Sequence, residues 1–356
     1  MKAIRIHEFG GPEVLRYEDV PDPQPRKDQV LVRVKACAMN HLDIWVRKGL
    51  PGVKLPHILG SDVAGEIVEV GEYITGFKVG QRVLVAPMHF CNHCAKCVAG
   101  LQNQCPEFSV LGNAVDGANC ELIAVPGVNV IPIPDSLDFN QAASVPLVFL
   151  TAWHMLVGRA RIRPGQTVLV LGANSGVGIA GIQVAKFFNC EVITTAGDEH
   201  KMAKARELGA DHVINHYQQK IAEEVRRITN KQGVDIVLEH VGPATWDESL
   251  RSLKPAGTLV TCGATTGPQV GIDLRFVYSP AIIHSWFLHG NHGRITRGTE
   301  ARFQWTIEAG CRSYVSLEGS SRCSRVHGEE SHVRQDRAEP LTEGFSFQIF
   351  KVEVRT

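Results

Sequence analysis

The chain has 356 residues, and its 37 lysines and arginines are balanced by 37 aspartates and glutamates. This length predicts two domains with sizeable cores, and the balanced charge argues against a nucleic-acid or membrane-surface partner. No apolar run is long enough to span a bilayer, and Met1–Gly10 lacks the apolar core of a signal peptide. Ten cysteines without an export signal indicate reduced thiols or metal ligands, so we expect a cytoplasmic protein.

The first part of the chain, residues 1–130, combines short β-rich runs with proline and glycine turns. The runs are Val30–Val34, Ala64–Val70, Arg82–Ala86 and Cys120–Val125. This pattern predicts a compact, mostly β domain. The following stretch, Asp135–Gly158, has helical character, and Asp138 is a candidate N-cap.

Four cysteines lie close together within the β-rich domain, in a loop at about residues 88–108. Their spacing is Cys91-x2-Cys94-x2-Cys97-x7-Cys105. Four thiolates this close can complete a tetrahedral shell around one Zn²⁺ and leave no open position, which defines a structural site. The alternatives are a dithiol redox pair or unligated cysteines. We predict one structural zinc ion with these four ligands.

The stretch Thr167–Lys186 predicts a dinucleotide site. An apolar run, Val168–Leu171, indicates a buried strand, and the glycines after it lead into a helix predicted over Ile179–Lys186. Glycines allow close backbone approach, and a helix N-terminus presents free N–H groups to a pyrophosphate. The expected contacts are Gly172, Ala173, Ser175, Gly176, Val177 and Gly178. The alternative is a glycine-rich turn that binds no nucleotide.

The sequence around this loop repeats a strand–helix pattern. The further predicted elements are the strand Glu191–Ala196, the helix Lys201–Leu208 and the strands Val234–Leu238 and Thr258–Cys262. Such a repeat predicts an α/β fold with a doubly wound parallel sheet, here over residues 131–280, which binds a nicotinamide dinucleotide.

The end of the second strand bears on the choice between NADPH and NADH. An NADH site usually has an acidic residue there, and this chain has Gly197, which leaves room for a larger group. Lys201 can meet a 2′-phosphate, whereas Asp198 and Glu199 favour NADH if they turn inward. We expect NADPH, with NADH as the alternative.

The cysteine loop, the motif GANSGVG and the phrase Leu150-Thr151-Ala152-Trp153 resemble the medium-chain dehydrogenase/reductase superfamily. The resemblance runs from Met1 to about Tyr278. It implies a GroES-like catalytic domain, a Rossmann domain, a cleft between them and a homodimer or homotetramer. It also implies that Thr151, Gly263 and Ala264 lie near the nicotinamide.

This family includes zinc alcohol dehydrogenases and zinc-free NADPH:quinone reductases. The positions that match the catalytic zinc ligands hold Asn40, Ser61 and Leu147, and only Asp62 retains a metal-binding group. An open catalytic zinc needs three protein ligands, so we expect none here. A different site from Cys37, His41 and His57 is a weaker alternative, because lone histidines and buried cysteines are more often structural.

Without a Lewis acid, hydride transfer to an electrophilic small molecule is easier to explain than alcohol oxidation. The resemblance implies a reductase of quinones or α,β-unsaturated carbonyls in which Asn40, Asp62 and Thr151 serve catalysis. Asn40 can donate a hydrogen bond to the acceptor oxygen or merely fix a turn. The alternatives are a zinc-type alcohol dehydrogenase and a non-catalytic nucleotide-binding or interaction protein.

Residues 281–356 form an atypical tail. His289–Thr299 and Glu318–Ala338 show neither helical nor strand periodicity. Codons for Ser331–Thr342 that are read one nucleotide later can give SHMFGKIVLNP, which resembles the family's usual ending. We hypothesise a frameshift near Ser279–Pro280, which would remove the last Rossmann strand and the closing piece of the catalytic domain. The alternative is a genuinely divergent C-terminus.

Overall fold

A computed structural model describes residues 1–275 and 283–286, and these residues divide into two units between Leu147 and Val148. The boundary lies later than residue 130, where the sequence analysis placed it. The helix α3 (Phe139–Ala143) accounts for the difference, because it packs on two strands of the first unit, β3 (Gln29–Ala38) and β5 (Asp62–Val70).

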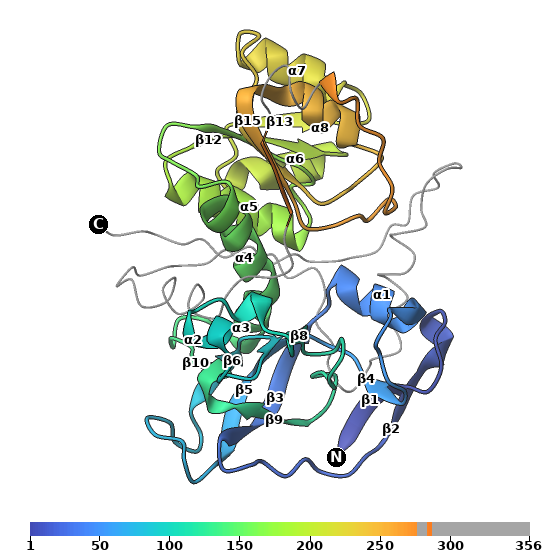
Figure 1. Ribbon diagram of the computed structural model, residues 1–356, viewed down its shortest axis with the longest axis vertical. Helices are drawn as coiled ribbons and strands as arrows, with labels where there is room; N and C mark the ends of the chain where they lie inside the picture. Colours follow the sequence, from blue (N-terminus) through green and yellow to red (C-terminus); the bar gives the residue numbers. More distant parts are fainter. Residues whose placement is uncertain (276–282, 287–356) are drawn as a thin grey trace. The chain divides into compact units, whose positions relative to one another are not determined.

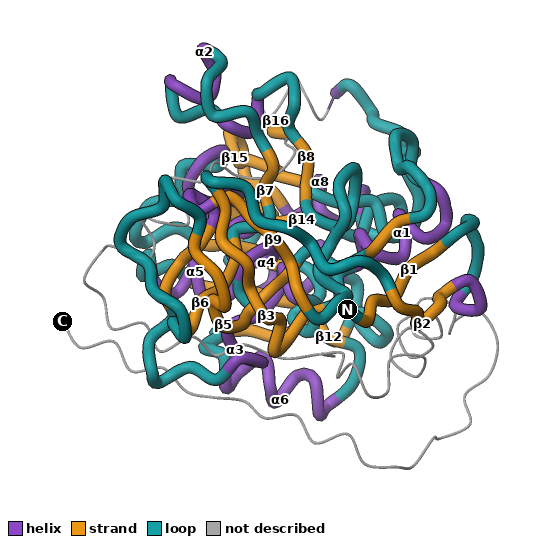
Figure 2. The backbone as a smooth tube through the Cα atoms, turned by 90° about the horizontal axis from the view of Figure 1, so that it is seen from below, coloured by secondary structure: helices purple, strands orange, loops and turns teal. Residues whose placement is uncertain are grey.

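The first unit is built on antiparallel β-structure. Its five-stranded sheet has the order β10-β6-β5-β3-β9, and Figure 2 shows β6, β5 and β3 side by side. A three-stranded sheet, β2-β1-β4, and a two-stranded sheet, β7-β8, complete it. The remaining strands are β1 (Lys2–Ile6), β2 (Leu15–Asp19), β4 (His57–Ile58), β6 (Arg82–Val85), β7 (Met88–His89), β8 (Ser109–Val110), β9 (Leu122–Pro126) and β10 (Val130–Pro132).

One hydrophobic core lies within this unit and takes alternate residues from the strands. Val30 and Val32 of β3, Ile67 of β5 and Val83 of β6 are all fully buried in it. Alternation along antiparallel strands directs every second side chain to one face, which explains the spacing of these residues. Besides α3, the helical segments are α1 (His41–Gly49), α2 (Ala95–Val98) and the 3₁₀ turns Pro12–Val14, Gln102–Gln104 and Gly127–Asn129.

The second unit contains a six-stranded parallel sheet with the order β13-β12-β11-β14-β15-β16. The strands are β11 (Thr167–Val170), β12 (Glu191–Ala196), β13 (His212–Asn215), β14 (Val234–Glu239), β15 (Leu253–Thr261) and β16 (Ile283–Trp286). In order of appearance this is 3-2-1-4-5-6, the order of a Rossmann fold. The predicted fold class is therefore confirmed.

Helices cover both faces of this sheet (Figure 1). They are α5 (Gly176–Phe187), α6 (Glu199–Glu207), α7 (Ile221–Ile228) and α8 (Trp246–Ser252), and α4 (Pro146–Trp153) precedes them and continues into a π-helical turn, His154–Arg159. Val168 and Val170 pack into a core with α5, whereas Leu169 and Leu171 pack into a second core with α7 and α8. Successive side chains of the apolar run therefore pack alternately into two hydrophobic cores, one on each face of the sheet.

Capping side chains set the helix starts. Asp138 accepts a hydrogen bond from Gln141 N at 2.8 Å, which confirms it as the N-cap of α3. The helical character predicted over Asp135–Gly158 divides into α3, α4 and the π-helical turn, and Pro146 begins α4 because it has no N–H to donate. In the second unit, α5 begins at Gly176 instead of the predicted Ile179 because Ser175 caps it.

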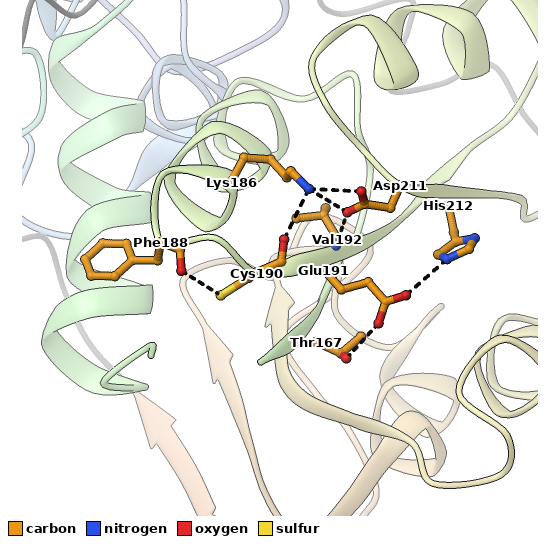
Figure 3. A network of polar contacts seen from close by, with 8 residues as sticks. All are labelled: Thr167, Lys186, Phe188, Cys190, Glu191, Val192, Asp211 and His212. Atoms are coloured by element: carbon orange, nitrogen blue, oxygen red, sulfur yellow. Dashed lines mark hydrogen bonds and ion pairs between the residues drawn. The ribbon is translucent and has the colours of Figure 1, made fainter. Parts of the chain in front are cut away.

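At the amino ends of three parallel strands, polar contacts tie the sheet to α5 (Figure 3). Lys186 Nζ pairs with Asp211 Oδ2 at 2.8 Å, and Asp211 also accepts from the N–H of Val192 in β12. Glu191 Oε1 lies 3.2 Å from His212 Nε2. Because parallel strands share one direction, this network lies at the sheet edge opposite to the glycine loop.

The strand β16 corrects the expectation that the sheet lacks its last strand. It pairs in parallel with β15, for example Thr258 with Ile283, and so supplies the sixth strand. The remaining frameshift predictions, on His289–Thr299 and Glu318–Ala338, lie outside the described residues. Among the helices that the structure describes, none has the length and apolar character needed to cross a membrane.

Candidate functional site

The glycine loop follows β11 at the carboxyl edge of the parallel sheet. Gly172 has φ +62°, a left-handed conformation that favours glycine. A Cβ on Gly178 would lie 2.1 Å from the carbonyl oxygen of Gly172, and one on Gly181 would lie 2.9 Å from Leu238 Cδ1. Side chains at positions 178 and 181 would therefore push α5 away from the sheet.

Ser175 closes this loop as the N-cap of α5. Its hydroxyl accepts from Gly178 N and donates to the carbonyl of Gly172, both at 2.9 Å. The carbonyls of α5 cannot reach the N–H groups of Gly176 and Val177, because these belong to the first helical turn. A glycine cradle with free N–H groups at a helix N-terminus fits a pyrophosphate. Ala173 is buried, and its N–H donates to Thr195 O at 2.9 Å.

His240 was missed by the sequence analysis. Its Nε2 atom lies 3.0 Å from Ser175 Oγ and 2.8 Å from the carbonyl oxygen of Leu171. His240 follows β14, which pairs with β11 at the point where the strand order reverses. Ligands of such sheets bind at that point. The sequence shows a histidine two residues after the predicted strand Val234–Leu238, but nothing local indicates its contact with Ser175.

The predicted nicotinamide-side residues lie around the same edge. A Cβ on Gly263 would lie 2.8 Å from the carbonyl oxygen of His240, so the turn of Gly263 and Ala264 passes close to the end of β14. On α4, Val148 packs against Gly176, since a Cβ there would lie 2.7 Å from Val148 Cγ1. Thr151 is three residues further along α4, which places it on the same helix face, and it is buried.

Gly197 directly follows β12, and the ring of Tyr217, which follows β13, lies against it. A Cβ on Gly197 would lie 2.4 Å from Tyr217 Cε2, and Tyr217 is 59% exposed. Asp198 caps α6 by accepting from Lys201 N at 2.8 Å, and it also pairs with Lys201 Nζ at 3.0 Å. The carboxylate that would favour NADH is thus bound to its own helix. No local pattern in the sequence indicates a role for Tyr217.

The four cysteines of the loop come together. Cys91 Sγ lies 3.9 Å from Cys97 Sγ and 3.5 Å from Cys105 Sγ, and all four sulfur atoms lie within 4.8 Å of one another. A tetrahedral zinc with Zn–S bonds of about 2.3 Å requires sulfur separations of about 3.8 Å. The donor set therefore fits a closed zinc site.

Backbone N–H groups surround these sulfur atoms. Cys94 N donates to Cys91 Sγ at 3.4 Å, and Glu107 N donates to Cys105 Sγ at 3.4 Å. Hydrogen bonds from the backbone N–H groups of His93 and Cys94 lower the pKa of Cys91 to about 6. Such bonds favour the thiolate, which is the form that binds zinc. His93 itself turns its Nδ1 toward the carbonyl of Cys91 at 2.7 Å.

In the first unit, Asn40 and Asp62 form a hydrogen-bonded pair with Asp43 beside them. Asn40 Nδ2 donates to Asp62 Oδ2 at 2.8 Å, and Leu147 N donates to Asp62 Oδ1 at 2.7 Å. Asp43 accepts from the N–H groups of Asn40 at 2.7 Å and Gly60 at 2.9 Å. Both carboxyl groups are 1% exposed. By accepting the hydrogen bond from Asn40 N, Asp43 fixes the start of α1, and Asn40 is the N-cap of this helix.

Burial controls the ionisation of these two carboxyl groups. It raises the pKa of Asp62 to about 7, against the opposing hydrogen bonds from Asn40 and Leu147. It also raises the pKa of Asp43 to about 6. Asp62 can therefore exchange a proton near neutral pH, which is what a general acid needs.

The positions that match catalytic zinc ligands do not supply a ligand set. Leu147 is apolar, Ser61 is fully buried, and its Oγ has no hydrogen-bond partner among the described residues. In the part of the chain that the structure describes, the groups of three or more metal-ligating side chains all include Cys91. The alternative residues bind elsewhere: Cys37 Sγ donates to Asn119 Oδ1 at 3.2 Å, and His57 Nδ1 lies 3.4 Å from Asp116.

A chain that has one unit with a Rossmann sheet and a glycine cradle, and another unit with a cysteine loop and a buried polar pair, is a nicotinamide-dependent oxidoreductase. The comparisons with known proteins agree. The family model "alcohol dehydrogenase GroES-like domain" matches residues 26–135, and "zinc-binding dehydrogenase" matches residues 176–297. The chain belongs to the medium-chain dehydrogenase/reductase superfamily and is similar to its quinone reductase-like branch.

Individual relatives carry both activities in their names. A quinone oxidoreductase of Rattus norvegicus is 35% identical over 266 residues, which cover 74% of this chain and 73% of the relative. One of Pseudomonas aeruginosa is 34% identical over 274 residues, covering 77% and 76%. The crystal structure of an NAD-dependent alcohol dehydrogenase is 39% identical, with a TM-score of 0.81, and covers 83% of this chain and 87% of that one.

The family match also bears on the tail. It extends to residue 297, beyond Tyr278, where the sequence analysis ended the resemblance. Together with β16, it places family-like sequence after Ser279–Pro280. The match therefore runs past the residues at which the frameshift was placed, but it does not test the reading frame, and the frameshift near Ser279–Pro280 stays a prediction.

Proposed function

We propose that this protein is an NADPH-dependent reductase of quinones or α,β-unsaturated carbonyl compounds and uses no catalytic zinc. The observation that carries the proposal is the bond between Asn40 Nδ2 and Asp62 Oδ2 at the positions that match zinc ligands. A neutral amide there leaves no Lewis acid to stabilise an alkoxide. A conjugated acceptor is already electrophilic and needs mainly orientation against the hydride donor.

The reaction requires one hydride and one proton. Bound NADPH supplies the hydride from its nicotinamide ring. Asn40 Nδ2 carries two hydrogens, and one of them bonds to Asp62. We assign the second to the acceptor oxygen, where negative charge develops as the hydride arrives. The protonated fraction of Asp62 near neutral pH supplies the proton, and the resulting carboxylate keeps its bonds from Asn40 and Leu147.

The preference for NADPH is supported by the end of β12. Gly197 has no side chain, Lys201 lies at the start of α6, and the exposed Tyr217 ring lies against Gly197. A 2′-phosphate needs such room and a nearby cation. The pairing of Lys201 with Asp198 is an exposed contact that a phosphate can replace at small cost.

The cofactor preference is tested by replacing Lys201 with alanine. We expect Lys201→Ala to raise the Kd for NADPH about 5- to 10-fold, since a charge-assisted contact is lost, and to leave the Kd for NADH unchanged. Lys220→Ala is the matched control, because Lys220 forms a similar exposed pair with Glu223, three residues on. Equal changes in both Kd values would contradict the NADPH assignment.

The reaction is tested by measuring zinc per chain together with NADPH oxidation by a quinone and by an enone. One zinc per chain with turnover is the expected result. Two zinc ions with alcohol oxidation and no quinone turnover would favour a zinc alcohol dehydrogenase; the related crystal structure is that of an NAD-dependent alcohol dehydrogenase. Tight NADPH binding without any turnover would favour a non-catalytic nucleotide-binding protein.

A further inference from the structure

We propose that His240 is a positioning residue for the cofactor: its Nε2–H holds the pyrophosphate loop in its binding shape through Ser175. The inference rests on the nicotinamide dinucleotide of the proposed function. It concerns the two contacts of His240 Nε2, at 3.0 Å to Ser175 Oγ and 2.8 Å to Leu171 O.

The hydrogen-bond partners fix which nitrogen carries the hydrogen. The carbonyl oxygen of Leu171 can only accept, so Nε2 of His240 must be protonated. Likewise the carbonyl of Gly172 only accepts, so the Ser175 hydroxyl hydrogen points at it. The Ser175 oxygen is then left to accept from Gly178 N and from the His240 Nε2–H, whose single hydrogen is shared between Ser175 Oγ and Leu171 O. The hydroxyl uses its donor and both lone pairs.

This arrangement matters because the loop must receive an anion. Carbonyl oxygens that face a pyrophosphate would repel it, and here the carbonyls of Leu171 and Gly172 are both engaged by hydrogen donors. The N–H groups of Gly176 and Val177 remain at the helix N-terminus for the ligand. His240 thus orients the loop before the cofactor arrives, and a preorganised loop loses less entropy on binding.

The imidazole also restrains the backbone of Gly172. A Cβ on Gly172 would lie 3.3 Å from His240 Cε1, so the ring packs directly against this residue. Gly172 has φ +62°, and its freedom to leave that conformation is limited by the ring on one side. Its N–H donates to Thr195 Oγ1 at 2.9 Å on the other. Ring volume and N–H donation are therefore separable contributions.

Two substitutions separate them in the full-length, zinc-loaded protein. His240→Phe keeps an aromatic ring, slightly larger than imidazole, and removes the donor, and His240→Gln restores an N–H donor on a flexible chain. The matched control is His212→Phe, because His212 pairs with Glu191 at the opposite sheet edge (Figure 3). We measure NADPH binding by titration without acceptor, thermal unfolding without cofactor, and steady-state kinetics.

We expect His240→Phe to raise the Kd for NADPH about 10-fold, in line with the loss of the one N–H donor that Ser175 Oγ and Leu171 O share, with kcat within about twofold. His240→Gln should return Kd to within about threefold of the wild type, and His212→Phe should leave it unchanged. Nitrogen NMR of the histidines should show His240 in the Nε2–H form without cofactor.

Three results would overturn the proposal. They are an unchanged Kd in His240→Phe, a Kd raised equally in His240→Gln, and an NMR signal for hydrogen on Nδ1 alone. Failure of the underlying function is separate, because a wild-type protein that binds neither NADPH nor NADH would refute both together. If the wild type binds NADPH and His240→Phe binds it with the same Kd, only the role of His240 is refuted.

Discussion

Two places in the first unit match metal sites of the family, and they differ in every property that zinc requires. At the cysteine loop, four sulfur atoms lie within 4.8 Å of one another and accept backbone hydrogen bonds. The second place is formed by Asn40, Ser61, Asp62 and Leu147. Here the Asn40 amide donates a hydrogen bond to the Asp62 carboxyl group. Ser61 and Leu147 supply neither the thiolate nor the imidazole that a zinc ion prefers. The donor groups at the two places therefore support the proposal of a structural zinc without a catalytic one.

The difference is also electrostatic. Backbone N–H groups lower the pKa of Cys91 and so favour the charged ligand, whereas burial raises the pKa of Asp62 and favours the neutral acid. Within the cysteine loop the thiolate form is favoured at Cys91, while burial raises the pKa of Cys97 to about 12, so Cys97 must lose its proton when zinc binds. A buried carboxyl group that favours the neutral acid can instead deliver a proton. The comparison predicts opposite responses to metal removal and to pH.

The largest effect is expected from Cys97→Ser, which removes a buried sulfur ligand from the cysteine loop. Structural zinc contributes on the order of 10 kcal/mol in small domains, so we expect zinc content to fall to near zero and the loop to lose protection from hydrogen exchange. Metal analysis and exchange mass spectrometry measure both. Cys190→Ser is the control, since this buried thiol donates to Arg163 O outside the loop. A variant that keeps one zinc per chain would break the comparison.

The second effect is on stability against pH. The folded-state pKa of Asp62, about 7, lies above the ordinary value of 3.8, so the folded state binds the proton more tightly. Protonated Asp62 therefore contributes to the free energy of unfolding below pH 4. This contribution, about 4 kcal/mol, is lost as the pH rises toward 7. Asp43, with a pKa of about 6, acts in the same direction.

Asp62→Asn should therefore reduce the loss of stability between pH 4 and pH 7, as measured by urea unfolding at several pH values. The neutral amide can keep both contacts if the Asn40 amide turns over and accepts from it. Asp211→Asn is the contrast, because the pKa of Asp211 is lowered in the folded protein despite partial burial, by hydrogen bonds from Lys186 and Val192. An unchanged pH slope in Asp62→Asn would contradict the raised pKa.

The third effect is on catalysis. Asn40→Ala removes the donor assigned to the acceptor oxygen, and we expect kcat for a quinone to fall about 30- to 100-fold, or about 2–3 kcal/mol. Zinc content and the Kd for NADPH should not change, because Asn40 belongs neither to the cysteine loop nor to the glycine loop. If kcat is retained, Asn40 only fixes the start of α1, the structural alternative that its position before Asp43 allows.

The parts of the fold that were predictable are those whose cause is local in sequence. Val168–Leu171 alternates between two apolar cores, so a continuous apolar run was a reliable sign of a strand buried on both faces. The glycine positions were equally informative, because a Cβ on Gly178 would collide with the backbone of Gly172. Cysteine spacing predicted a loop that indeed brings four sulfur atoms together.

The missed residues depend on contacts between distant segments. His240 reaches Ser175 only because β14 lies next to β11, and Tyr217 reaches Gly197 only because β13 lies next to β12. Strand order is a property of the whole sheet, so neither contact has a local signal. The missing-strand prediction was wrong for a related reason: the pairing with β15 gives Ile283–Trp286 its strand structure.

The smallest effect is expected from a substitution of Ser61, which stands at one of the positions that match a catalytic zinc ligand. Ser61 is fully buried, and its hydroxyl has no hydrogen-bond partner in the part of the chain described. A buried hydroxyl without a partner contributes no net stability, so Ser61→Ala should change the free energy of unfolding by less than about 1 kcal/mol, with either no loss or a slight gain. Ser252→Ala is the matched control, because Ser252 is equally buried and donates to Glu248 O at 2.7 Å.

Urea unfolding of both variants should show a loss in Ser252→Ala that Ser61→Ala does not share. The quinone KM then distinguishes two explanations for the unsatisfied hydroxyl. If the KM rises about threefold or more in Ser61→Ala while stability is unchanged, the hydroxyl serves the acceptor, and the former ligand position has become part of the substrate site. A destabilised Ser61→Ala protein would show instead that Ser61 has a structural partner and that the two metal positions differ less than their side chains indicate.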